Sequence, residues 1–211
     1  MPTSSSPAML VPLWRRTRQG GVAAVEFALV ALVFFLFLFA MMEVARAVYL
    51  WNTVQEITRR AARAAAVANF ADAGAMQRLR QQAVFRDSPG RLVMGGAITD
   101  SYVRIDYLSL PGGAAQPVPL GALPGCPARN LVNCINDPNG ASCIRFVRAS
   151  LCLPDGPGGP NGAAGACRPV PYQPIVPMVG MLFPAGVSLP TGATVAVAES
   201  LGYRPGMALC L

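Results

Sequence analysis

Residues 22–42 form an apolar run that contains a single charged residue, Glu26. As an α-helix this run would span about 31 Å, which matches the roughly 30 Å hydrocarbon core of a bilayer. No other part of the sequence has an apolar run of this length, so we expect one membrane-spanning helix. A carboxylate costs about 2.5–3.5 kcal/mol at the centre of an inserted helix. Glu26 is therefore the first candidate functional residue.

Cleavage between Gly21 and Val22 would give the Glu26 carboxylate a specific partner. Val22 would then carry a new α-amino group, with Glu26 at the fifth position of the shortened chain. The amine and the carboxylate would lie roughly 6 Å apart along the helix axis, so a neighbouring helix shifted by one turn would bring its amine beside Glu26. An opposite charge within about 4–6 Å favours the ionised carboxylate. Such a carboxylate penalises a single subunit and stabilises an assembled one.

The sequence around this bond has the features of a prepilin cleavage site. Three arginines precede a Gly-Gly-Val-Ala-Ala-Val-Glu-Phe sequence at residues 20–27, and the apolar run is followed by Glu-Val-Ala-Arg at residues 43–46. These features most resemble the TadE-like pseudopilins of tight-adherence (Tad/Flp) pilus systems. Residues 52–68 continue the resemblance, and residues 198–206 do so less specifically.

This resemblance implies a function. It implies a non-enzymatic minor pseudopilin, cleaved after Gly21 by a prepilin peptidase and using Glu26 to pair subunits in the membrane. The implied partners are other pilins or pseudopilins and the inner-membrane assembly platform. An alternative is a permanently anchored, single-pass scaffold of a secretion or pilus machine, and a third hypothesis is an anchored periplasmic enzyme.

Two simpler interpretations of the N-terminal segment remain open. In an ordinary signal anchor, Glu26 would extend toward the lipid headgroups and the glycine pair would only loosen the start of the helix. In a cleaved secretory signal, the apolar core would be 7–15 residues long and followed by a small-x-small cleavage site. The longer run here favours the prepilin interpretation.

Charge predicts the orientation of the chain. Arg15, Arg16 and Arg18 precede the apolar run and no acidic residue does, so the positive-inside bias places the N-terminus in the cytoplasm. Together with the resemblance, this orientation implies a bacterial inner-membrane protein in contact with membrane lipid, with its C-terminal part in the periplasm. All seventeen basic residues are arginine, and the net charge of +7 falls to a dispersed +4 when the three leader arginines are removed. A nucleic-acid surface needs clustered charge, so we expect no nucleic-acid partner.

All six cysteines follow the apolar run. No two form a Cys-x-x-Cys motif and the chain has no histidine, so we expect no metal site and no cofactor. An even number of cysteines outside the cytoplasm indicates disulfides. Of fifteen possible connectivities, the spacing favours pairs that close the short loops 136–140 and 154–165 and tie down the tail: Cys134–Cys143, Cys152–Cys167 and Cys126–Cys210.

Residues 22–70 are expected to form one long helix, because they contain neither proline nor glycine. Its second half has a predicted packing face, either a domain core or a subunit contact: Val44, Val48, Trp51, Val54 or Gln55, Thr58, Ala62, Ala65 and Ala68. Arg46 lies off this face. A short helix is expected at residues 75–85, with Met76, Leu79 and Ala83 turned inward.

Alternating apolar residues predict strands at residues 101–110, 142–153 and 193–198, with a weaker one at 92–98. Proline- and glycine-rich loops are expected at 111–127, 136–141 and 154–165. The fold class is therefore α+β, a long membrane helix packed at its exposed half on a small antiparallel sheet, as in pilins. The expected parts are a leader (1–21), the membrane half of the helix (22–42), an extracytoplasmic helical region (43–90) and a β-rich head (91–211).

Residues 172–189 carry no charge and include Met178, Met181, Leu182 and Phe183. This segment is either a loop that covers the core or an exposed contact for another pseudopilin or for the bilayer surface.

The sequence contains no recognisable catalytic motif. Without histidine, acid–base chemistry would depend on scattered carboxylates. Asp100 and Asp106 are expected on or beside a polar strand face, in contact with solvent. We therefore expect a protein that is not an enzyme.

Overall fold

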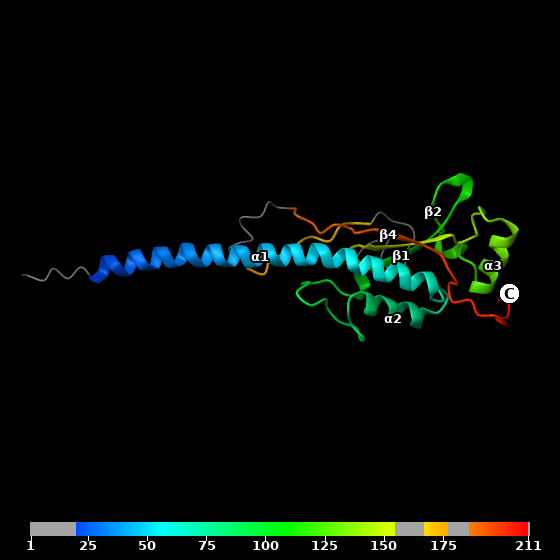
Figure 1. The fold of residues 1–211 in the computed structure, drawn as a ribbon, viewed down its shortest axis with the longest axis horizontal. Coiled ribbons are helices and arrows are strands. Elements are labelled where there is room, and N and C mark those ends of the chain that lie inside the picture. Colours follow the sequence, from blue (N-terminus) through cyan, green and yellow to red (C-terminus); the bar gives the residue numbers. More distant parts are fainter. Residues whose placement is uncertain (1–19, 155–166, 177–185, 211) are drawn as a thin grey trace, which may run out of the picture.

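The computed structural model describes residues 20–154, 167–176 and 186–210. A helix of 48 residues, α1 (Gly20–Val67), projects far beyond the rest of the molecule, and the other elements gather around its C-terminal half (Figure 1). At about 1.5 Å per residue α1 is roughly 72 Å long. The long helix and the α+β class expected from the sequence are both confirmed.

The helix ends three residues earlier than expected, and a polar side chain explains why. Asn69 accepts a hydrogen bond from the Ala71 amide at 3.0 Å, a local turn that competes with further helix. Asp72 then caps α2 (Ala73–Ala83) by accepting from the Ala75 amide at 3.0 Å. The second helix begins two residues before its expected start, and Met76, Leu79 and Ala83 are buried as expected.

Four antiparallel strands form a sheet in the order β2-β1-β3-β4. Their bounds are β1 (Val103–Ser109), β2 (Gln116–Pro117), β3 (Phe146–Leu151) and β4 (Thr194–Val197). Ile105 of β1 lies opposite Ala149 of β3, which lies opposite Thr194 of β4. Three of the four expected strands are thus present, each shorter than its sequence pattern.

The core lies between the C-terminal half of α1 and one face of the sheet. Val54, Ile57, Ala61 and Ala65 of α1 are completely buried there, against β1, β3 and β4. The alanines allow the sheet to approach closely. Gly192 has the same role, because a Cβ at this position would lie 2.8 Å from Cγ1 of Val54.

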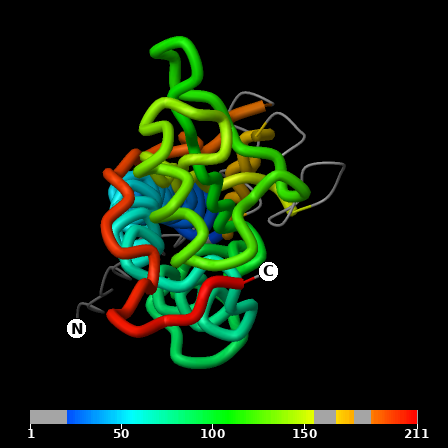
Figure 2. Tube along the Cα trace, turned by 90° about the vertical axis from the view of Figure 1, so that its right-hand side faces the viewer, coloured from blue at the N-terminus to red at the C-terminus, as the bar shows by residue number. Residues whose placement is uncertain are grey.

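The C-terminal segment (red in Figure 2) passes beside the end of α1. The amides of Glu199 and Leu201 both donate to the Ala66 carbonyl at 3.1 Å. Gly202, with φ +82°, lies so close to the backbone of Asn69 that a Cβ would be 2.6 Å from its nitrogen. A side chain is excluded here by both the conformation and the space.

Three disulfides connect the irregular parts of the head: Cys126–Cys210, Cys134–Cys143 and Cys152–Cys167. They are the same pairs that the spacing favoured. Two of them hold α3 (Pro127–Asn136), which begins directly after Cys126 and contains Cys134. The sequence analysis did not identify α3.

Predictions made from the sequence were wrong in three further places. Residues 92–98 form turns with one flanking bridge between Arg91 and Thr99, since the positive φ of Met94 and Gly96 is incompatible with a regular strand. The short strand β2 lies inside the expected loop 111–127. Asp100 is buried and accepts a hydrogen bond from Gln77, so it is not explained by solvent contact.

The packing face predicted for α1 is confirmed only from Val54 onward. Val54, Thr58, Ala62 and Ala65 are buried, whereas Val44, Val48 and Trp51 are exposed. In the earlier turns the side chains turned toward the head are Glu43, Arg46 and Leu50. Apolar periodicity indicated the wrong face there because the head contacts a pair of opposite charges.

Candidate functional site

The Gly21–Val22 bond lies in the first turn of α1, with exposed side chains around it. A Cβ on Gly21 would meet no atom of the described residues within 4 Å, so these residues leave this face of the helix open. Val22 and Glu26 are four residues apart and therefore share one face of α1. The expected processing and assembly residues are thus adjacent and accessible.

From residue 22 to residue 42, α1 has an apolar surface that nothing among the described residues covers. It is long and apolar enough to cross a membrane. Glu26 is the sole charged residue on it and is exposed. This surface is suited to contact with lipid or with similar helices.

A buried ion pair stands directly after the apolar run. Glu43 and Arg46 are only 2% and 4% exposed, and Arg46 Nη1 donates to Glu43 Oε1 at 3.0 Å. The two residues are one helical turn apart, which brings their side chains together on one face. This face is turned toward the head, contrary to the expectation for Arg46.

The head completes the hydrogen bonding of the Glu43 carboxylate. The Tyr172 hydroxyl donates to Glu43 Oε1. The Ile175 amide donates to Oε1 at 3.3 Å and to Oε2 at 3.2 Å, and the Val176 amide donates to Oε2 at 3.4 Å. The carboxylate therefore holds a segment that lies about 130 residues further along the chain.

The Arg46 guanidinium is held in the same way. Its Nε donates to the Met94 carbonyl at 2.9 Å and its Nη1 donates to the Gln173 carbonyl at 2.8 Å. The guanidinium carbon also lies 5.2 Å from the centroid of the Tyr172 ring, a cation–π distance. We call Glu43, Arg46 and Tyr172 the junction cluster, because they join α1 to the head where the apolar run ends.

The electrostatics of the junction cluster fix its protonation state. Burial raises the pKa of Glu43, but hydrogen bonds from Tyr172, Arg46 and the Val176 and Ile175 amides outweigh burial and leave this pKa below its usual value. Burial and the neighbouring carboxylate raise the pKa of Tyr172 to about 12. At neutral pH the cluster thus contains a carboxylate, a guanidinium and a neutral phenol donor.

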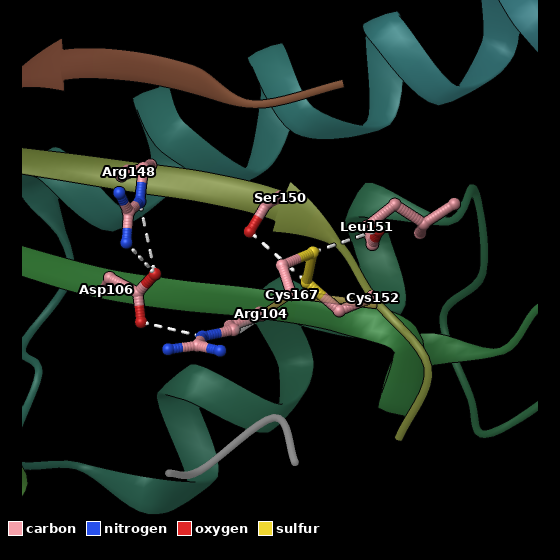
Figure 3. Close-up of a disulfide and its surroundings, with 7 residues drawn as sticks. All are labelled: Arg104, Asp106, Arg148, Ser150, Leu151, Cys152 and Cys167. Carbon is pink, nitrogen blue, oxygen red and sulfur yellow. Dashed lines mark hydrogen bonds and ion pairs between the residues drawn. A yellow bond between two sulfur atoms is a disulfide. The ribbon is translucent and has the colours of Figure 1, made fainter. Parts of the chain in front are cut away.

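A second charge cluster, of buried Arg104 and Asp106 with half-buried Arg148, lies on the sheet face turned away from α1. Asp106 Oδ1 accepts from Arg104 Nε at 2.8 Å, and Asp106 Oδ2 accepts from Arg148 Nη2 at 2.8 Å. Figure 3 shows the three side chains beside Ser150 and the Cys152–Cys167 disulfide. Asp106 is buried, so the expectation of a solvated carboxylate was wrong, and the cluster joins β1 to β3.

The apolar segment 172–189 lies partly outside the described residues. Its predicted contact residues Met178, Met181, Leu182 and Phe183 fall in the part, 177–185, that the structure does not describe. Both ends of the segment are described, and Tyr172 and Leu189 pack against the core. A groove of about 280 Å³ between these ends and α1 is lined by Val48, Trp51 and Val187 among others.

Within residues 20–154, 167–176 and 186–210, no group of three or more histidine, cysteine or acidic residues is arranged to hold a metal ion. The six cysteines are all paired.

Sequence reasoning missed the junction cluster as a site. The available signal was the Glu-x-x-Arg spacing at residues 43–46, immediately after the apolar run. Tyr172 gave no comparable signal, because nothing in the sequence relates a tyrosine to a helix residue so far away.

Comparison with known proteins agrees with the features of the helix. No curated protein and no solved structure matches the chain. Residues 21–63 match the family model described as TadE-like protein. The match begins at Gly21, includes Glu26, Glu43 and Arg46, and ends inside the core-forming half of α1. The resemblance drawn from the sequence is confirmed over this segment, where α1 is similar to TadE-like proteins.

Proposed function

We propose that the chain is a minor pseudopilin, a non-enzymatic structural component of a Tad-type pilus assembly. The observation that carries this proposal is the TadE-like match over residues 21–63, on a helix whose first half has an apolar surface that none of the described residues covers. A single carboxylate stands on that surface, one turn beyond Gly21. An isolated subunit gains nothing from this residue in a bilayer, whereas an assembled one can pair it.

In the proposed mechanism, a prepilin peptidase cuts the Gly21–Val22 bond and frees the α-amine of Val22. The amine of one subunit then lies beside the Glu26 carboxylate of a neighbour displaced by about one helical turn. This ion pair leaves neither charge uncompensated in the apolar layer, and it sets the axial stagger between neighbouring helices. Apolar contacts along residues 22–42 add packing that does not depend on that stagger.

The proposed arrangement follows from the same features. The leader (1–21) lies in the cytoplasm, residues 22–42 cross the bacterial inner membrane, and the helical region (43–90) and head (91–211) lie in the periplasm. An oxidising compartment is consistent with three disulfides in the head. The proposed partners are other pilins or pseudopilins, the peptidase, the assembly platform and membrane lipid.

Processing is tested by the mass of the mature protein in cells that contain a prepilin peptidase. Gly21→Leu should retain the leader and be about 2 kDa heavier than wild type, given 22.1 kDa for 211 residues. Gly121→Leu is the matched control, because a Cβ there also meets no atom within 4 Å. It should be cut normally. An uncut wild-type protein would favour the permanently anchored scaffold, and efficient cutting of Gly21→Leu would refute the assigned bond.

A further inference from the structure

Exposed apolar side chains gather around α1 just beyond the end of its apolar run. The head contributes Val93, Met94 and Ile175, and α1 contributes Val44; each is more than half exposed. We call these four residues the apolar collar. Exposed apolar residues at one level of a molecule indicate a contact surface.

The junction cluster fixes the level of the collar along α1. The Ile175 amide donates a hydrogen bond to the carboxylate of Glu43, and the Met94 carbonyl accepts one from the guanidinium of Arg46. Glu43 and Arg46 lie about 1.5–6 Å beyond Met42 along the helix axis. The head residues of the collar are thus held within about one helical turn of the apolar run.

This level coincides with the headgroup layer of a bilayer. A bilayer is about 40–45 Å thick with headgroups and about 30 Å without them, which leaves roughly 5–7 Å for each headgroup layer. If residues 22–42 fill the hydrocarbon core, the residues bonded to Glu43 and Arg46 lie in that layer. Apolar side chains there are favourable, because they reach the acyl-chain boundary.

The charges around the collar are compatible with this environment. Residues 44–55, 91–98 and 168–176 contain no acidic residue. Glu43, the carboxylate that accepts from the Ile175 amide, is buried and paired with Arg46. Arg91 is exposed two residues from Val93, where a cation suits lipid phosphates. No unpaired carboxylate among these segments would have to lose its hydration.

We propose that the apolar collar inserts into the headgroup layer of the bilayer that α1 crosses, so that the head is seated on the lipid surface. The junction cluster sets the depth of this contact by fixing residues 94 and 175 to the first turn of α1 beyond the membrane. The inference rests on the proposed function only in taking residues 22–42 as a membrane span. It does not require cleavage or polymerisation.

The test is tryptophan quenching in full-length protein reconstituted into phosphatidylcholine vesicles with brominated acyl chains. Trp14 and Trp51 are first replaced by phenylalanine. Single tryptophans are then introduced as Ile175→Trp, Val93→Trp, Val197→Trp and Phe39→Trp. Val197 is the matched control, since its exposure of 63% equals that of Ile175 (62%) within one per cent. Val197 lies near the level of Ala66 on α1, because Glu199, two residues further along, donates its amide hydrogen bond to the Ala66 carbonyl.

We expect bromolipid to reduce the fluorescence of Phe39→Trp most, that of Ile175→Trp and Val93→Trp by an intermediate factor, and that of Val197→Trp not at all. If Ile175→Trp and Val93→Trp behave like Val197→Trp while Phe39→Trp is quenched, the collar is refuted and the span stands. If Phe39→Trp is also unquenched, the span is refuted and the collar with it.

Discussion

The hydroxyl of Tyr172 donates a hydrogen bond to the carboxylate of Glu43, although the two residues lie 129 positions apart in the sequence. This bond joins the head to α1 directly after the apolar run. The Ala66 carbonyl, which accepts from the Glu199 and Leu201 amides, fixes the opposite end. The head is thus attached at both ends of the C-terminal half of α1, and the core lies between the two attachments.

Tyr172→Phe removes one donor from the Glu43 carboxylate. A hydrogen bond to a charged group contributes about 1.5–3 kcal/mol, so the free energy of unfolding should fall by this order. Denaturant unfolding of the detergent-solubilised protein measures the change. Tyr49→Phe is the matched control, because Tyr49 is an exposed tyrosine on α1, one to two helical turns from Arg46 and Glu43. Equal stability of the two variants would contradict the role of the junction cluster.

Glu43→Gln leaves the buried guanidinium of Arg46 without its counter-charge. Removing one partner of a buried ion pair costs about 3–5 kcal/mol. We expect a large loss of stability and faster proteolysis of the head in the membrane-inserted protein. Glu56→Gln, which breaks the exposed pair with Arg60, should have little effect. Comparable proteolysis of the two variants would show that Glu43 is not a stabilising contact.

The junction cluster predicts how stability depends on pH. The pKa of Glu43 is lowered by folding, so its contribution is present above the unfolded value of about 4.5 and is lost as pH falls through the folded pKa. The pKa of Tyr172 is raised by folding from 10.0 to about 12, so its contribution is present below pH 10 and is lost as pH rises toward 12.

Unfolding curves measured across this range should therefore show a plateau of stability with losses on both sides. Tyr172→Phe should weaken the alkaline loss without abolishing it. Burial raises the pKa of Tyr107 as well, so that second tyrosine still contributes. An alkaline profile unchanged in Tyr172→Phe would contradict the assigned cause.

The Cys126–Cys210 disulfide closes the longest loop of the three, with a sequence separation of 84 between its cysteines. Replacing both cysteines by alanine should lower the free energy of unfolding by about 2–5 kcal/mol. Thiol labelling of denatured, unreduced wild-type protein should modify none of the six cysteines. Labelling of most of them would refute the disulfides and the periplasmic location.

Local patterns in the sequence were enough to predict part of this structure. The absence of proline and glycine predicted α1, and the alternation of apolar residues predicted β1, β3 and β4. Cysteine spacing led to the same three pairs that the structure contains, because two of the pairs close short loops and leave one remaining. Gly21, Val22 and Glu26 could be proposed from the sequence as processing and assembly residues because their relationship is confined to six residues.

The remaining features depend on contacts between distant segments. Val44, Val48 and Trp51 are exposed because the opposite side of α1, with Glu43 and Arg46, is turned toward the head. The burial of these two charges requires Tyr172 and the backbone of residues 173–176. Asp106 is buried because Arg148 lies opposite it in β3, a register that alternation alone does not specify. The helix α3 is short and begins at a proline after a cysteine, a composition that also suits a loop.

Co-assembly of Glu26→Gln tests the central claim most directly. The variant is compared with wild type and with Glu56→Gln in cells that form the pilus, by the fraction of each protein that crosslinks to other pilin subunits. We predict that Glu26→Gln is inserted and cut after Gly21 but loses its crosslinks, while Glu56→Gln keeps them. Wild-type crosslinking by correctly cut Glu26→Gln would contradict the pairing of Glu26 with a neighbour's amine and favour a membrane anchor.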